Sequence, residues 1–451
     1  MKKYISLFVA LLWIGSVQAQ ENKIKFTEYD LDNGLHVILH QDNSTPIVAV
    51  SIMYHVGSKN EDPSRTGFAH FFEHLLFEGT KNIERGTFDK LITNAGGVYN
   101  ANTSNDRTFY YEILPSNQLE LGLYLESERL LHAKIDPVGV ETQREVVKEE
   151  KRQRIDNQPY GSILEEISKR AYTKHPYRWT TIGSMEHINE ATLEEFIEFY
   201  KTFYVPENAT LSIAGDIDVP EIKKLIAKYF ADIPRGKKDV PRPNIVEPKQ
   251  KAEVRDVVFD NIQLPAVISA YHMPAQGTDD YYALNMLSTL LSGGQSSRMY
   301  KAVVDEQQKA VAAGAFPFSS EDPGLYLTFG IASLGTDVSD LENAMDEEIE
   351  RVKKELVSDR EFQKIRNQTE NNFISSNSTI AGIAESLANY HVYFGDANLI
   401  NTEIDKYMSV TKEDLKRVAN KYLNSNNRVV LHYLPESAKS KPSDTEIKTN
   451  N

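Results

Sequence analysis

The sequence contains no cysteine among its 451 residues. This absence excludes disulfide bonds, thiolate zinc sites, iron–sulfur clusters and a cysteine nucleophile. A metal site in this chain must therefore use His, Asp or Glu side chains. Basic residues are also in the minority, with 50 Lys and Arg against 65 Asp and Glu and a net charge of −15. Because nucleic-acid binding needs basic surface to neutralise phosphates, we expect no nucleic-acid partner.

The N-terminus lacks an apolar run long enough to anchor the chain in a membrane. The run at residues 5–14 is about half of the roughly 20 residues that a spanning helix needs. Two lysines precede this run and the small-x-small sequence Val17-Gln18-Ala19 follows it, which is the pattern of a secretory signal peptide. We therefore predict a signal peptide at residues 1–19, no membrane anchor, and an exported protein that is periplasmic or secreted.

Turn and strand signals favour an α+β fold. Asn33-Gly34 predicts a hairpin turn, and the segment from Ile47 to Val56 predicts a strand. Further on, helix-period and strand-period segments are interleaved without the regular rhythm of a parallel sheet. Residues 236–254 are rich in proline and lysine and predict an extended interdomain linker. The polar stretch 437–451 predicts a disordered tail.

Short patterns recur on either side of the predicted linker. Tyr54-His55-Val56 recurs 217 residues later as Tyr271-His272-Met273, and the helix–turn–strand pattern that begins near Thr192 recurs 219 residues later near Thr411. Two matches at nearly the same offset, with the linker midway, indicate a duplicated domain. We predict an N-terminal domain at residues 20–235 and a homologous C-terminal domain at residues 255–436.

The strongest local signal is the pentapeptide 70–74, which reads His-Phe-Phe-Glu-His. On a helix, His70 and His74 share one face, so both imidazoles can reach a single metal ion. Glu73 is close enough to take a proton from a water molecule that the metal makes acidic. The alternative is a pair of histidines packed in an apolar helix.

A zinc site of this kind needs a third protein ligand, and the helix predicted at residues 141–150 offers candidates. Glu150 follows Val146 and Val147 by four and three residues and so continues their apolar face. A carboxylate on a buried face needs a partner such as a metal ion. Glu150 is therefore the candidate ligand, and solvent exposure is expected for the other glutamates of this helix, Glu141, Glu145 and Glu149.

The motif resembles the inverted H-x-x-E-H sequence of the insulinase or pitrilysin-like zinc peptidases, a family that includes the mitochondrial processing peptidases. In that family a third ligand, a glutamate, lies about 76 residues downstream, and Glu150 lies 76 residues after His74. The similarity covers almost the whole mature chain and continues through residues 96–104, 107–110, 175–177 and 293–298. It implies an antiparallel sheet flanked by helices in each half, with four such domains forming a clamshell of which this chain is one half.

The same resemblance implies roles for individual residues. It implies one zinc ion per chain, held by His70, His74 and Glu150, with Glu73 as the general base. In that family an edge strand pairs with the substrate backbone, which gives affinity with little sequence specificity. The corresponding substrate-binding residues here are Gly97, Val98, Asn100, Ala101 and Asn102. From the residues alone, the segment that contains them is predicted to be an ordinary edge strand.

The sequence departs from the family pattern in both halves. Gln143 replaces a second glutamate, which is expected to alter zinc affinity because outer-shell groups orient metal ligands. Active members use an Arg and a Tyr, seven residues apart, to bind substrate and stabilise the oxyanion. Those positions fall on Val304 and Val311, which cannot donate a hydrogen bond. In the second half the counterparts of the motif residues are Asn285, Ser288 and Thr289, so we expect one metal site per chain.

These observations lead to the hypothesis of a zinc endopeptidase that hydrolyses short or unfolded peptides inside a closed chamber. A second, related chain that supplies the missing Arg and Tyr would make the enzyme a heterodimer, and a homodimer is possible. The alternative is a non-catalytic scaffold or peptide-binding subunit, although such relatives commonly lose part of the motif that is complete here. A metal-dependent enzyme of another kind is disfavoured by the duplication.

Overall fold

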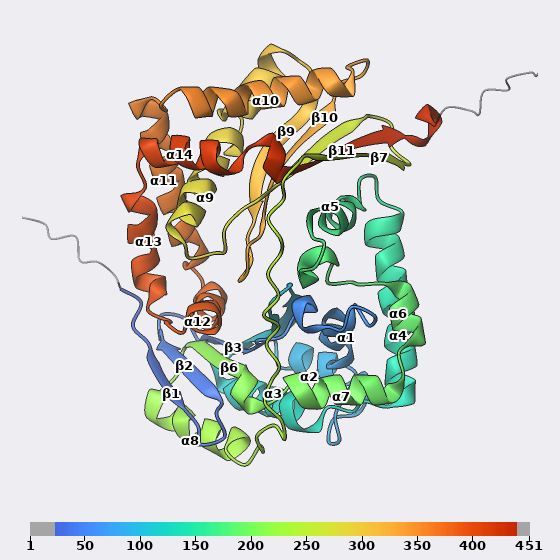
Figure 1. The fold of residues 1–451 in the computed structure, drawn as a ribbon. Coiled ribbons are helices and arrows are strands. Elements are labelled where there is room, and N and C mark those ends of the chain that lie inside the picture. The colour runs from blue at the N-terminus through green and yellow to red at the C-terminus, as the bar shows by residue number, and fades with distance from the viewer. Residues whose placement is uncertain (1–22, 440–451) are drawn as a thin grey trace, which may run out of the picture.

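The computed structural model describes residues 23–439. This part of the chain forms two β-sheets flanked by helices (Figure 1), which confirms the predicted α+β class. The predicted signal peptide at 1–19 lies outside the described residues, as do residues 440–451 of the predicted tail. The start of that tail forms part of a 3-10 turn at Glu436–Ala438. Among the described residues, no helix combines the length and the apolar character needed to cross a bilayer.

The first sheet has the strand order β1-β2-β6-β3-β5-β4. The strand β1 pairs antiparallel with β2 through the turn predicted at Asn33-Gly34, and β4 lies at the opposite edge. The strands of this half are β1 (Thr27–Asp30), β2 (His36–Gln41), β3 (Ile47–Tyr54), β4 (Val98–Thr103), β5 (Thr108–Pro115) and β6 (Ala209–Gly215). Its helices are α1 (Phe68–Leu75), α2 (Phe88–Asn94), α3 (Leu119–His132), α4 (Pro137–Lys151), α5 (Ile163–Ala171), α6 (Met185–Glu190), α7 (Leu193–Phe203) and α8 (Val219–Phe230).

The second sheet has the order β7-β11-β8-β10-β9, which repeats the order of the first sheet from β2 onward. The duplication inferred from short sequence matches is therefore visible in the topology. Its strands are β7 (Val254–Asp260), β8 (Ala266–His272), β9 (Ala310–Phe318), β10 (Leu325–Ala332) and β11 (Arg428–Pro435). The helices are α9 (Asp279–Ser292), α10 (Val338–Lys354), α11 (Asp359–Ser376), α12 (Ile380–Phe394), α13 (Leu399–Ser409) and α14 (Lys412–Tyr422), with a π-helical segment, η6, at Tyr300–Glu306.

Neither sheet is purely antiparallel, which corrects one detail of the expectation. The strands β2 and β6 run parallel, and so do their counterparts β7 and β11. Parallel neighbours need a long crossover connection, and in both halves three strands and most of the helices lie between the two parallel strands in the sequence. The repeat preserves this feature together with the strand order.

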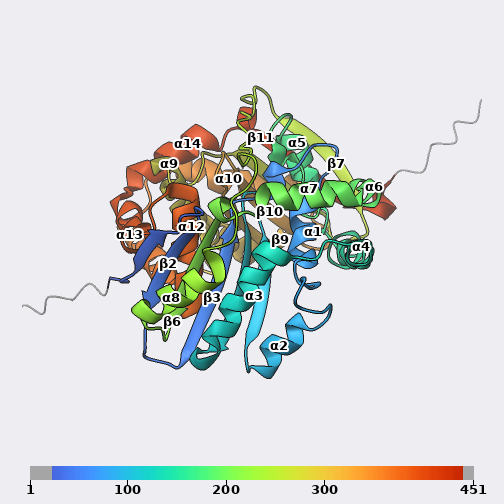
Figure 2. The same cartoon turned by 90° about the horizontal axis from the view of Figure 1, so that it is seen from below.

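Each sheet has a main core between one of its faces and the helices of its own half. In the first half, Phe71 and Phe72 of α1 pack on Phe196 of α7, with ring centroids 4.5 Å and 6.1 Å apart. Figure 2 shows α3 and α8 lying over the strands of this sheet. In the second half, α9, α10 and α14 contribute most of the buried helical residues of the corresponding core.

The other face of each sheet is covered by a helix from the other half. Ile167 of α5 belongs to a core cluster with Ile268 of β8, while Leu387 of α12 belongs to one with Ile38 of β2 and Ala214 of β6. In Figure 1, α12 lies beside the blue strands of the first sheet and α5 beside β11 of the second. Because both faces of the central strands are covered, those strands are apolar almost throughout rather than alternating.

The two halves are joined by an extended segment and by buried charges. Residues 231–253, between α8 and β7, contain no helix or strand, and β7 begins at Val254, the last residue of the predicted linker. The side chain of Lys59 is 8% exposed. Its Nζ lies 3.1 Å from Oδ1 of Asp106 in the first half and 2.5 Å from Oε2 of Glu321, in the turn between β9 and β10 of the second half. Because helices are exchanged across the linker, the boundaries 20–235 and 255–436 stay predictions for independent domains.

Candidate functional site

The short helix α1 separates apolar from polar side chains by its periodicity. Phe68, Phe71, Phe72 and Leu75 are buried in the first core, at the spacing of one helix face. The polar motif residues of α1 fall on another face, toward β4 and α4, because side chains three and four positions apart are neighbours on a helix. Core packing of the phenylalanines therefore sets the direction of the motif residues.

Buried polar groups hold both ends of α1. Gly67, the N-cap, has a φ of 98° that favours glycine, and a Cβ there would lie 2.7 Å from the carbonyl oxygen of Ile182. The Glu61 carboxylate accepts hydrogen bonds from the backbone N–H groups of Gly67 and Ala69, both at 2.8 Å. Burial raises the pKa of Glu61 to about 8, against these hydrogen bonds, which lower it. At the other end, Arg129 donates to the carbonyl oxygen of Leu76 at 3.0 Å.

Arg129 belongs to a fully buried charge cluster. Its guanidinium donates to Glu126 at 3.0 Å and to Glu112 at 3.3 Å, and all three side chains have no exposed surface. The guanidinium also lies 4.5 Å from the ring centroid of Phe77 and 4.3 Å from that of Tyr110. Two carboxylates in an apolar core need this cation, because an unpaired buried charge is strongly destabilising.

We expect Arg129→Met to lower the free energy of unfolding by about 3–5 kcal/mol, because it leaves the buried carboxylates of Glu112 and Glu126 without their partner. Denaturant unfolding followed by circular dichroism measures this change. The control is Arg152→Met, which removes a surface ion pair with Glu149 (Arg152 is 56% exposed) and should cost less than about 1 kcal/mol. Equal effects of the two substitutions would contradict the structural role of Arg129.

The helix α4 brings Glu150 to the two histidines. Its Oε2 lies 3.4 Å from His70 Nε2 and 3.0 Å from His74 Nε2, and one donor atom from each of the three residues lies within 4.8 Å of the others. Burial and the neighbouring His74 lower the pKa of His70 to about 4, and a hydrogen bond from His74 lowers the pKa of Glu150. A neutral imidazole and an ionised carboxylate are the forms that bind metal ions. The second carboxylate oxygen of Glu150 accepts from Arg154 at 2.6 Å.

The exposure of the other glutamates on α4 matches the periodicity argument. The side chain of Glu150 is 13% exposed, against 47% for Glu149. Val147 is buried, but Val146 is 42% exposed, so the prediction that Val146 belongs to the buried face is wrong. The remaining solvated side chains are Glu141 and Glu145, at 68% and 71% exposed.

Glu73 faces the end of the edge strand β4. Its carboxylate accepts a hydrogen bond from the Thr103 hydroxyl at 2.6 Å. Burial raises the pKa of Glu73, and the Thr103 hydrogen bond opposes that rise. Thr103 is the last residue of β4, and no local sequence pattern relates it to Glu73, which lies 30 positions away.

The predicted substrate-binding residues lie at or next to the open edge of the first sheet. Gly97 directly precedes β4 and is buried, whereas Val98 is 61% exposed. Asn100 is also exposed, and Ala101 and Asn102 are half-buried. The strand β4 pairs with β5 on one side and is the last strand of its sheet. Within the described part of the chain no strand pairs with its other side, so that side can accept a further strand.

Gln143, which stands where the resemblance implies a glutamate, belongs to a separate polar group. Its amide donates to Glu78 at 2.5 Å, and Glu78 in turn pairs with Arg85. Glu141 and Glu145 do not replace the missing carboxylate, because both are exposed on α4.

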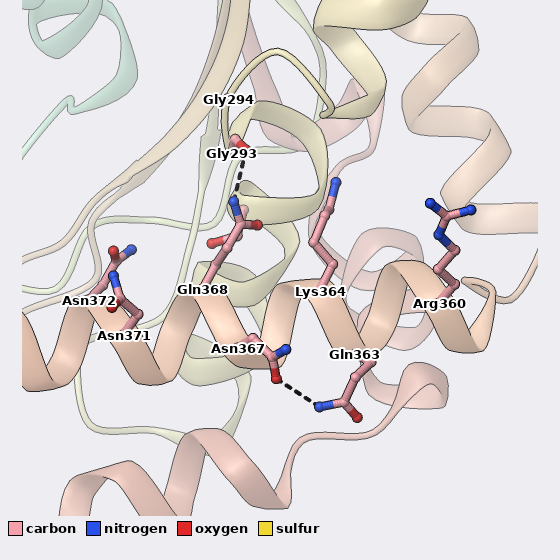
Figure 3. Close-up of a pocket in the computed structure, with 10 residues that line it drawn as sticks. Gly293, Gly294, Arg360, Gln363, Lys364, Asn367, Gln368, Asn371 and Asn372 are labelled. Atoms are coloured by element: carbon pink, nitrogen blue, oxygen red, sulfur yellow. Dashed lines mark hydrogen bonds between the residues drawn. The ribbon is translucent and has the colours of Figure 1, made fainter.

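The described part of the second half holds no ligand cluster of its own that matches His70, His74 and Glu150. Val304 packs against the second core, and Val311 is 54% exposed on β9. A cavity of about 860 Å³ lies along α11 (Figure 3), where Gln368 donates to the Gly293 carbonyl oxygen at 3.1 Å. Thr289, the counterpart of His74, is among its lining residues, none of which is a histidine or a carboxylate.

A two-sheet α+β chain with H-x-x-E-H on a short helix, and a glutamate brought from a second helix, has the arrangement of an inverted-motif zinc peptidase. Family comparisons agree with this class. The family model for insulinase (peptidase family M16) matches residues 36–184, and the model for the peptidase M16 inactive domain matches residues 190–369. The chain belongs to the insulinase family, peptidase family M16.

Similar proteins carry peptidase names. The zinc protease PqqE of Helicobacter pylori is 32% identical over 431 residues, which cover 95% of this chain and 97% of that protein. The mitochondrial-processing peptidase subunit beta of Blastocladiella emersonii is 25% identical over 403 residues, covering 87% of this chain and 85% of that one.

Solved structures share the fold. A protease from Helicobacter pylori superposes with a TM-score of 0.87 at 31% identity, covering 91% of this chain and all of that one. The periplasmic protease PqqL from Escherichia coli gives a TM-score of 0.75 at 19% identity, and this chain covers 47% of its length. The latter likeness concerns the fold alone.

Proposed function

We propose that this chain is a zinc-dependent endopeptidase that hydrolyses short or unfolded peptides in a clamshell chamber. The observation that carries the proposal is the convergence of His70, His74 and Glu150 next to Glu73, beside the open edge strand β4. Its relatives are named zinc proteases, which supports the same activity.

His70, His74 and Glu150 fit a zinc ion by their chemistry and placement. Two imidazoles and a carboxylate are a usual ligand set for catalytic zinc, which keeps a further position open. In the structure their donor atoms face one another and the side chains are only 11%, 25% and 13% exposed. When bound, zinc acts as a Lewis acid that polarises the scissile carbonyl and makes water acidic.

Glu73 acts as the general base in this proposal. A carboxylate takes a proton most effectively when its pKa lies near the working pH, and burial moves the pKa of Glu73 upward. The Thr103 hydroxyl holds one oxygen of the carboxylate, so the other remains available for the proton of the attacking water. Glu73 then delivers the proton to the leaving amine.

The substrate backbone is proposed to pair with β4. Gly97, Val98, Asn100, Ala101 and Asn102 provide main-chain groups along an edge with no strand beyond it in the described part of the chain. Pairing through main-chain hydrogen bonds accepts many sequences, provided that the peptide is extended. Thr103 links the end of this strand to Glu73, so a peptide on β4 lies beside the proposed base.

N-methylation of single amides in a model substrate tests this pairing. Each methyl group that removes a hydrogen bond to β4 should raise KM roughly 3- to 10-fold, the equivalent of about 1 kcal/mol. Only alternate residues of an edge-paired peptide direct their N–H toward the edge, so the effect should recur at every second position. Methylation of the terminal residues serves as the control. A uniform effect along the peptide would contradict strand pairing.

The missing hydrogen-bond donors at Val304 and Val311 lead us to propose a partner. A second, related chain would supply an Arg and a Tyr to the same chamber, giving a heterodimer, and a homodimer is the other arrangement. One relative is named as a beta subunit, which supports assembly with another chain. The same valines favour a second candidate function, that of a non-catalytic peptide-binding subunit.

The predicted signal peptide leads us to place the enzyme outside the cytoplasm, in a periplasm or in the medium.

Hydrolysis of a quenched, unstructured peptide by the purified mature chain tests the activity, with Glu73→Gln as the blank. Cleavage above the blank supports an endopeptidase that suffices alone. Activity that appears only when a related chain with the Arg and Tyr is added supports the heterodimer, and no activity in either case favours the non-catalytic subunit.

A further inference from the structure

A second group of metal-ligating side chains lies at the junction of the two halves. Glu28 of β1, His36 of β2 and His391 of α12 each bring one potential ligand atom within 4.8 Å of the other two. In the first sheet, β2 is separated from β4 by β6, β3 and β5. The helix α12 covers the face of the sheet opposite the main core to which α1 belongs. This cluster is therefore distinct from the His70 centre.

His36 is oriented as a histidine that binds a metal ion. Its Nδ1 lies 2.7 Å from Asp30 Oδ1, and because a carboxylate can only accept, Nδ1 carries the proton. In the neutral ring, Nε2 then presents its lone pair. That atom is buried, has no hydrogen-bond partner among the described residues, and lies 3.4 Å from Glu28 Oε2. A proton or a metal ion between Nε2 and Oε2 satisfies both atoms, and a carboxylate on the other ring nitrogen is the usual support of a metal-bound histidine.

His391 completes the group from the other half of the chain. Its ring lies parallel to that of His36, with centroids 3.4 Å apart and an interplanar angle of 5°. In parallel rings the lone pairs point side by side, so a shared ion requires one ring to turn toward the other. The Glu28 side chain is 45% exposed and has room to adjust.

We propose that Glu28, His36 and His391 bind a divalent transition-metal ion, with Asp30 as the outer-shell group that holds His36. Two imidazoles and one carboxylate suit zinc, copper or nickel rather than magnesium or calcium, which prefer oxygen ligands. The ion ties the β1–β2 hairpin of the first half to α12 of the second half. It raises the capacity of the chain from one metal ion to two.

Zinc titration of the mature chain carrying His70→Ala tests the site, because this substitution removes a ligand of the other centre. We expect one zinc ion per chain by calorimetry and by metal analysis after dialysis. His36→Ala in this background should abolish binding, and Asp30→Asn should weaken it roughly 10- to 100-fold. The control is His132→Ala, which should leave binding unchanged. His132 pairs with Glu128 at 2.9 Å on α3, and within residues 23–439 no third ligand joins this pair.

A variant at the exposed Glu28 separates lost binding from lost structure. Glu28→Gln should keep the circular dichroism spectrum and the zinc-free melting temperature, yet bind zinc at least 10-fold more weakly because the charged ligand is gone. Zinc should raise the melting temperature of the His70→Ala chain and not that of the His36→Ala double variant. The proposal is overturned if the His70→Ala chain binds no zinc, or if it binds zinc equally well with and without His36 and the charge of Glu28.

Discussion

Replacing Glu73 with glutamine is expected to lower kcat/KM for a quenched peptide by about 10²–10⁴-fold while zinc stays bound. The amide keeps the size of the side chain and can still accept the Thr103 hydrogen bond, but it cannot take a proton from water. The proposed zinc ligands are His70, His74 and Glu150, so the metal content should not change. Steady-state kinetics and metal analysis on the same preparations measure both quantities.

A matched control uses a glutamate outside the cluster. Glu149 is adjacent to Glu150 on α4, but its side chain is 47% exposed and pairs with Arg152. Glu149→Gln should therefore change neither the rate nor the metal content. If Glu73→Gln kept the parental rate, Glu73 would not be the base, and if it lost zinc, the assignment of Glu73 as a residue that does not bind the metal would be wrong.

Replacing His70 with alanine is expected to remove one zinc ion from each chain and to abolish peptide hydrolysis. A three-residue ligand set that loses an imidazole leaves two ligands, too few for a stable catalytic zinc site. The reduction in rate should be at least as large as that of Glu73→Gln, because the Lewis acid itself is lost. Metal analysis after dialysis, together with the peptide assay, measures the change.

Loss of zinc by the His70→Ala variant has to be distinguished from loss of its fold. His70 is buried, so circular dichroism should first establish that the alanine variant is folded. Glu150→Gln, at a side chain that is 13% exposed, should give the same loss of zinc through a different ligand. If either variant retained the full zinc content of the parent chain, the ligand set would be wrong.

Residues close in the sequence allowed the central part of the candidate site to be predicted. The spacing of His70 and His74 places them on one helix face, and the structure brings Glu150 rather than Glu149 to them. The turn at Asn33-Gly34 and the repeat around Tyr54 were read from similarly local patterns. Helix and strand periods are properties of short segments, which is why these predictions needed no tertiary information.

Contacts between distant segments could not be read in this way. Glu61 and Arg129 hold the ends of α1, but their sequence neighbourhoods do not show which backbone groups they contact. The parallel pairing of β2 with β6 depends on where the chain returns after a long connection. The carboxylate of Glu28 meets His391 only because α12 crosses to the first sheet.

The two halves exchange helices: α5 of the first half covers the second sheet, and α12 of the second half covers the first sheet. The halves therefore associate as two subunits of a dimer do, but within one covalent chain. If α12 left the first sheet, the apolar face formed by β2, β3 and β6 would be exposed to water, and the loss of α5 would do the same to the second sheet. Each half thus depends on the other for its own folded stability, and the two are expected to unfold cooperatively. The linker keeps their effective concentration high, on the order of millimolar for a short flexible connection, so reassociation does not depend on the concentration of the protein.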